Sequence, residues 1–267
     1  MGKYTEYFKI GFKKSIEYKS YLIGALVTPL FMGFFFYFIW SYIFEVKSKG
    51  VAGFEIGGFT FEEMIIYLVI GLLIQTAKQT EISERISATI KSGDISIFLC
   101  RPVNFVKSLL SDGIGEKLIP FGTFVILLAI VTNLFAVKVP TITILVIFAI
   151  YGLLLIFFQI IIDVMIGGLA FWLTEIWGIR SSIQQILWIL SGRALPLSLF
   201  PQMMQRFLAW TPFLYLEYTF ASIYLMKLSI EEALRAMGIF MIWILILLVL
   251  MRWLYARGFA KLESFGG

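Results

Sequence analysis

The chain contains several apolar runs long enough to cross a lipid bilayer, and the clearest is residues 141–162, which carry no charged side chain. At a rise of about 1.5 Å per residue, a helix over this run spans a hydrocarbon core of about 30 Å. Hydrophobic residues make up 60% of the 267-residue chain, whereas soluble domains are nearer 45–50% apolar by a rough average. The sequence therefore predicts an all-α polytopic membrane protein.

Six apolar stretches are candidates for transmembrane helices, and we expect them to form a single transmembrane domain over residues 1–267. They cover about residues 21–44, 61–76, 118–137, 141–162, 181–190 and 233–255. The fourth stretch continues as an apolar extension to Ile176, and we place the next turn at Gly178 to Arg180.

The distribution of basic residues predicts the orientation of these helices. Residues 1–20 are amphipathic and rich in lysine, which is typical of a helix in the cytoplasmic interface of a membrane. With six spans both termini lie on one side, and that side also receives most of the 22 lysines and arginines. Since basic loops stay in the cytoplasm, we expect a multi-pass protein of the cell membrane with both termini and residues 78–117 in the cytoplasm.

The longest polar segment, residues 78–117, begins with the pattern of an amphipathic helix. Ile82, Ile86 and Ile90 recur four residues apart and share one face. Ser92-Gly93 then ends the helix, because glycine readily adopts the left-handed conformation found after a helix C-terminus. Such a helix lies along a partner protein, or alternatively along the membrane surface, held to lipid by its three isoleucines.

Two further short pieces complete this segment. An apolar run ends at Arg101-Pro102, where the residue before proline is pushed out of the helical region. A third amphipathic piece covers about residues 103–110. The segment is too regular for a passive linker, so we interpret it as a set of short helices.

Residues 193–222 are too polar for a plain span and too apolar for a free loop. Pro196, Pro201 and Pro212 interrupt the pattern three times. We expect short broken helices that re-enter one leaflet before the last span, since irregular backbone at membrane depth requires cover from protein or a water-filled cavity.

The composition excludes several kinds of chemistry. The chain has no histidine and a single cysteine, Cys100, which rules out His-dependent nucleophilic catalysis and a thiolate metal cluster. It also lacks a Gly–Lys–Ser/Thr phosphate-binding loop. We therefore expect no catalytic residue, no metal and no cofactor bound by this chain, and no nucleic acid partner.

Asp163 is the one acid clearly embedded in an apolar run, with Gln159 one turn earlier on the same helix face. A charge inside the membrane is costly and marks a functional position by default. The pair is a candidate for a substrate path. The alternative is that Asp163 lies at the cytoplasmic end of its span, either exposed or paired with a basic residue.

Two sets of motifs resemble the membrane subunits of ABC exporters of the ABC-2 type, and the resemblance covers nearly the whole chain. The first runs from Ile90-Lys91-Ser92-Gly93-Asp94-Ile95 to Leu99-Cys100-Arg101-Pro102-Val103-Asn104, between the second and third spans. The second is Ser191-Gly192-Arg193-Ala194-Leu195-Pro196, followed by Phe200-Pro201 and Thr211-Pro212-Phe213.

The resemblance implies a permease subunit of an ATP-binding cassette exporter. Two cytoplasmic ATPase subunits would bind ATP and Mg²⁺, and a second permease subunit, identical or related, would complete the membrane dimer. Residues 78–117 would act as the coupling segment that the ATPase grips. Its candidate contact residues are Glu84, Arg85, Lys91, Gly93, Asp94, Arg101 and Pro102.

Two other classes of function are open alternatives. An ATP-independent carrier or channel requires a polar line through the membrane, for which the sequence offers Gln159 and Asp163, with Gln75, Asn133, Gln184 and Gln185. A membrane-embedded enzyme is disfavoured, because the chain lacks histidine and a clustered set of acids.

Overall fold

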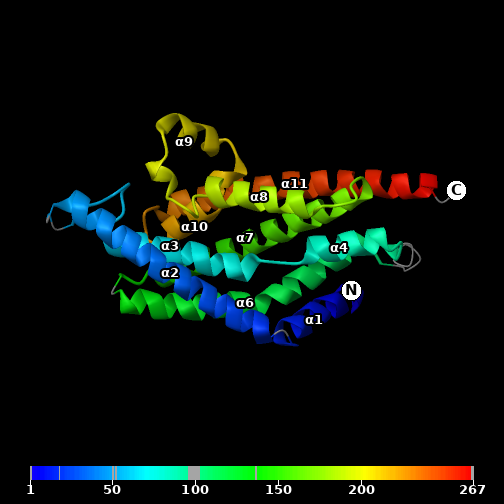
Figure 1. The fold of residues 1–267 in the computed structure, drawn as a ribbon, viewed down its shortest axis with the longest axis horizontal. Coiled ribbons are helices and arrows are strands. Elements are labelled where there is room, and N and C mark those ends of the chain that lie inside the picture. Colours follow the sequence, from blue (N-terminus) through cyan, green and yellow to red (C-terminus); the bar gives the residue numbers. More distant parts are fainter. Residues whose placement is uncertain are drawn as a thin grey trace.

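The protein is described by a computed structural model over residues 2–17, 19–49, 51, 53–95, 103–135 and 137–265, in which helices are joined by turns (Figure 1). This confirms the predicted all-α class over those residues. The α-helices are α1 (Gly2–Glu17), α2 (Lys19–Ser48), α3 (Phe61–Lys78), α4 (Ile82–Lys91), α6 (Phe105–Leu134), α7 (Ile142–Gly168), α8 (Trp177–Leu190), α9 (Gln202–Ala209), α10 (Glu217–Tyr224) and α11 (Ile230–Phe265). Short 3₁₀ helices occupy Leu169–Phe171, Leu197–Leu199 and Pro212–Tyr215.

Three helical stretches among the described residues are long and apolar enough to cross a membrane: Phe105–Leu134, Ile142–Phe171 and Ile230–Lys261. They overlap the third, fourth and sixth expected spans. Helices also form at the other three positions, as α2, α3 and α8. The 14 residues of α8 extend only about 21 Å at 1.5 Å per residue, so the total of six crossings stays a prediction.

Two helix boundaries differ from the sequence prediction. The amphipathic piece expected at residues 103–110 is no separate helix, because it forms the first turns of α6. That helix starts early because the Asn104 side chain caps it, accepting a hydrogen bond from the Lys107 N–H at 3.0 Å. The turn expected at Gly178 to Arg180 instead lies before Trp177, since α7 ends at its Gly167-Gly168 pair, where helix propensity is low.

The helices form an elongated bundle with both termini toward the same end (Figure 1). Helix α4 lies at that end of the bundle as well. The loops after α2 and α6 and the short helix α9 lie toward the other end. This placement agrees with an even number of crossings, and it separates α4 from α9 along the length of the molecule.

Stacked aromatic rings fill the centre of the bundle. The rings of Phe148 on α7 and Phe220 on α10 lie 4.1 Å apart and nearly parallel. Tyr151 stacks on Phe240 of α11 at 5.4 Å, and Phe124 of α6 lies 5.9 Å from Phe220. Aromatic ring pairs stabilise cores beyond simple burial, so α10 is an integral part of the core although it has only 8 residues.

Helix α1 crosses the first half of α6 at unusually close range. A Cβ atom on Gly11 would lie 2.0 Å from the Asp112 carbonyl oxygen, and one on Gly115 would lie 2.1 Å from that of Phe8. Glycine at both positions lets the two backbones touch. The N-terminal helix is thus packed on the bundle through its own backbone.

Candidate functional site

The apolar face of α4 is buried inside the protein. Ile82 and Ile86 are fully buried and Ile90 nearly so. Ile86 rests on Gly167 of α7, where an added Cβ would approach its Cβ to 2.8 Å, and Ile82 rests on Gly113 of α6. The alternative in which lipid holds these three isoleucines is therefore wrong, because all three are buried within the protein.

Arg85 on the polar side of α4 joins three helices through shared acids. Its guanidinium donates to Asp112 Oδ2 at 2.9 Å and to Glu116 Oε2 at 2.8 Å, both on α6. Lys14 of α1 also donates to Asp112, with Nζ 2.9 Å from Oδ2. About a third of the Arg85 side chain stays exposed. Arg85, a predicted ATPase contact, thus already forms ion pairs with residues of its own chain.

The other charged residues of α4 also have partners. Glu84 accepts a hydrogen bond from Nη1 of Arg180 on α8, while Nη2 of the same arginine donates to the Thr80 carbonyl oxygen at 2.6 Å. Lys91 lies 2.9 Å from Glu175 in a largely exposed pair, and exposed pairs contribute about 0–1 kcal/mol. Arg180 on α8 therefore holds α4 more firmly than the exposed Lys91–Glu175 pair does.

The C-terminal end of α4 is exposed and ends as the sequence predicts. Gly93 has a φ of +79°, the left-handed conformation expected there. Asp94 follows, accepting a hydrogen bond from the Ser92 hydroxyl at 2.7 Å. Lys91 to Asp94 are all exposed. The predicted contact residues Arg101 and Pro102 lie outside the described residues.

Gln159 and Asp163 lie side by side in α7, as their spacing predicts, and both are buried. Gln159 Nε2 donates to Asp163 Oδ2 at 3.1 Å. Asp163 is neither exposed nor in an ion pair with any described residue. The structure therefore does not support the alternative of an exposed or salt-bridged acid.

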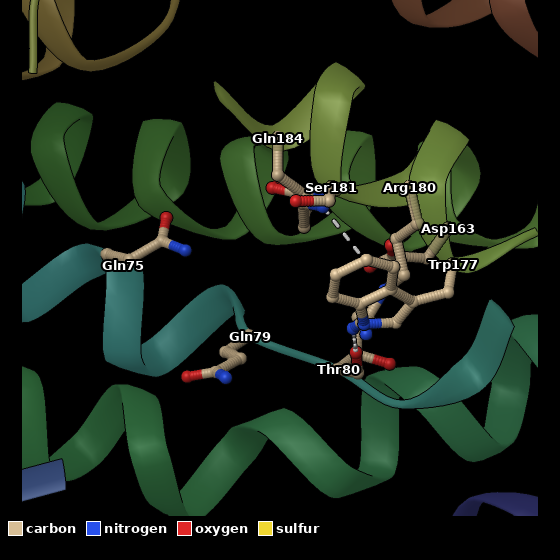
Figure 2. Close-up of a pocket in the computed structure, with 9 residues that line it drawn as sticks. Gln75, Gln79, Thr80, Asp163, Trp177, Arg180, Ser181 and Gln184 are labelled. Carbon is tan, nitrogen blue, oxygen red and sulfur yellow. Dashed lines mark hydrogen bonds between the residues drawn. The ribbon is translucent and has the colours of Figure 1, made fainter. Parts of the chain in front are cut away.

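The two residues line a polar pocket between α3, α7 and α8 (Figure 2). The cavity has a volume of about 240 Å³, and the chain segment from Gln75 to Thr80 forms its wall opposite Trp177 and Arg180. Gln75 and Gln184, two of the other polar residues predicted from the sequence, also line it. Asn133 and Gln185 do not: the former donates to the Ala129 carbonyl oxygen and the latter is exposed.

A buried ion pair between α3 and α10 was not predicted from the sequence. Lys78, in the last turn of α3, pairs with Glu217 at the start of α10, and both side chains are almost fully buried. At the other end of α3, Glu63 lies 2.7 Å from Lys227. One signal was available: Glu217 is the single acid between residues 193 and 230, and an acid in an apolar setting requires a partner.

The polar pocket and the ion pairs around α4 are suited to binding a ligand and to connecting helices. No group of three or more His, Cys, Asp or Glu side chains among the described residues is placed to hold a metal ion. The pocket presents amides, hydroxyls, an indole, one carboxylate and the Arg180 guanidinium, all of which form hydrogen bonds. The ion pairs around α4 connect helices to one another.

Comparison with known protein families identifies a transporter family. The profile of a family described as "ABC-2 family transporter protein" matches residues 25–266, which is nearly the whole chain. No curated protein and no solved structure matches the chain.

Proposed function

The chain belongs to the ABC-2 family of transporter proteins, and from this premise we propose that it is the permease subunit of an exporter driven by a separate ATPase. The permease itself is a membrane component. ATP and Mg²⁺ are bound by two cytoplasmic ATPase subunits, and a second permease subunit, identical or related, completes the membrane dimer. The protein crosses the cell membrane six times with both termini in the cytoplasm.

The placement of α4 is the observation that supports this proposal. One face of the helix is seated on glycines of α6 and α7, and Arg85 and Glu84 connect it to α6 and α8. The C-terminal end, Lys91 to Asp94, is exposed. A helix fixed along its length and exposed at its tip can pass a push at the tip to the helices behind it.

In this proposal residues 193–222 form the re-entrant region, and its C-terminal part is anchored in the bundle by the segment from Glu217 to Lys227. The pairs Lys78–Glu217 and Glu63–Lys227 tie its two ends to the two ends of α3, and the ring of Phe220 stacks in the core. Protein thus covers this short segment at membrane depth, as irregular backbone there requires.

Docking of the ATPase is tested by reversing charge at the exposed tip of α4. The double variant Lys91→Glu, Asp94→Arg should reduce the ATPase that co-purifies from native membranes by about tenfold or more, since like charges placed opposite each other at an interface cost several kcal/mol. Lys47→Glu is the control, because Lys47 is exposed at the end of α2, near the opposite end of the bundle. Unchanged co-purification in the double variant would contradict the docking site.

The polar pocket gives one reason to keep a carrier without ATP as the second candidate. Gln159 and Asp163 offer a polar site inside an apolar bundle, which a carrier also needs. The two candidates differ in their partner. Repeated isolation of a stable, folded chain with no P-loop ATPase would favour the carrier and remove the central support of the exporter.

A further inference from the structure

The pocket between α3, α7 and α8 contains a carboxylate that is only half satisfied. Asp163 is 1% exposed. Its Oδ2 accepts a hydrogen bond from Gln159, while its Oδ1 has no hydrogen-bond partner among the described residues. Burial of an uncompensated carboxylate is costly, so a donor that enters the cavity gains from meeting this oxygen.

The cations nearest the pocket are committed to other partners. Arg180 binds Glu84 and the Thr80 carbonyl oxygen through its two terminal nitrogens, while its buried Nε has no hydrogen-bond partner among the described residues. Lys78 is paired with Glu217, and Lys117 donates to Glu116 and to the Gln79 carbonyl oxygen. Each therefore has an acidic partner other than Asp163, which leaves the charge of that carboxylate for a ligand.

The other lining groups suit a small cation with N–H donors. The amides of Gln75 and Gln184 supply acceptor oxygens. The Trp177 indole lies at the edge of the cavity and is largely exposed, and an indole face attracts ammonium and guanidinium groups. A volume of about 240 Å³ admits a functional group with a short apolar stem.

We propose that this pocket binds an organic cation with N–H donors, a primary ammonium or a guanidinium, carried by the transported molecule. The inference rests on the proposed permease function. The cation donates to Asp163 Oδ1, and Trp177 packs beside it. Arg180 lines the same cavity and holds Glu84 of α4, so a movement of α4 reaches the binding site through one side chain.

The test compares two probes of equal shape, 2-phenylethylammonium and 2-phenylethanol, on the full chain in lipid nanodiscs with whatever ATPase co-purifies. Calorimetry measures binding, with empty nanodiscs as the correction for partition into lipid. The ammonium should bind about tenfold or more tightly than the alcohol, as expected for a hydrogen bond to a buried charge. Asp163→Asn should abolish that preference. Glu55→Gln should keep it, because Glu55 is an exposed acid that does not line the pocket.

Equal affinity for the two probes, tighter binding of the alcohol, or an unchanged preference in Asp163→Asn would overturn the proposal. If that variant does not insert stably, Trp177→Leu decides, because the exposed indole can be removed without opening the core. We expect it to weaken ammonium binding about threefold or more, and unchanged binding would overturn the proposal.

The same preparation separates this inference from the proposed function. An ATPase present without any ammonium preference would overturn the cation site and leave the permease standing. An ammonium preference that depends on Asp163, in a chain that never brings an ATPase, would support the site and overturn the exporter.

Discussion

Helices α4 and α9 are both short and amphipathic, with 10 and 8 residues, yet they differ in how far their apolar side chains are buried. The isoleucines of α4 are buried against glycines of α6 and α7. By contrast, Met203, Phe207 and Trp210 of the α9 region are 86%, 66% and 85% exposed, and α9 stands apart from the bundle (Figure 1). The same sequence pattern thus yields one helix fixed to the core and one whose bulky apolar side chains are mostly exposed, with Leu208 as the buried exception.

The largest difference should appear when one apolar side chain is shortened in each helix. Ile86→Ala leaves a cavity between α4 and α7 and should lower the free energy of unfolding by about 2 kcal/mol or more. Phe207→Ala removes an exposed ring and should change it by about 0.5 kcal/mol or less. Denaturant unfolding in detergent measures both values. Equal losses in the two variants would mean that α4 is no more firmly seated than α9.

The acid shared by α1, α4 and α6 should give the next largest effect. Asp112→Asn removes the negative charge that binds both Lys14 and Arg85, at a cost of about 1.5–3 kcal/mol for hydrogen bonds to charged groups. Arg206→Gln on α9 is the control, because no described residue forms an ion pair with Arg206. A neutral result for Asp112→Asn in the same unfolding assay would show that this network does not hold α4.

Replacement of Arg180 should lower the local stability of α4 more than the stability of the whole protein. Arg180→Gln removes the links to Glu84 and the Thr80 carbonyl oxygen. A loss of about 1 kcal/mol in local stability corresponds to roughly fivefold faster amide exchange. Hydrogen exchange should therefore rise in residues 82–91 and stay constant in residues 202–209. Equal acceleration in both segments would point to global loosening instead.

The smallest effect on stability is expected at the tip of α4. Lys91→Glu breaks an exposed pair with Glu175 and should change the free energy of unfolding by less than about 1 kcal/mol. The measurement separates docking from folding, because the same residue is expected to matter for the ATPase. Large destabilisation would place Lys91 in the framework of the helix rather than on its docking end.

Features set by neighbouring residues were predictable from the sequence. Gly93 ends α4 in the left-handed conformation because local sterics require it. Gln159 and Asp163 share a face because they are four residues apart on one helix. The long apolar helices α6, α7 and α11 were predictable because a membrane-spanning helix requires a long run of apolar residues.

Features set by distant residues were not predictable in the same way. Arg85 meets Asp112 and Glu116, which are 27 and 31 residues away, across the contact between α4 and α6 where Ile82 lies against Gly113. Lys78 and Glu217 are 139 residues apart, and no spacing rule connects them. Likewise, the pattern of α4 showed which face would be buried, but the choice between lipid, partner and bundle depended on tertiary packing.

Cross-linking from single cysteines tests most directly whether α4, and not α9, meets the ATPase. In a Cys100→Ser background, Asp94→Cys places a thiol at the tip of α4 and Met203→Cys places one on α9, each read out in native membranes with a short bifunctional reagent. We predict a cross-link to a P-loop ATPase from Asp94→Cys and none from Met203→Cys. A cross-link from α9, or none from α4 while the ATPase co-purifies, would contradict the assignment of α4 as the coupling helix.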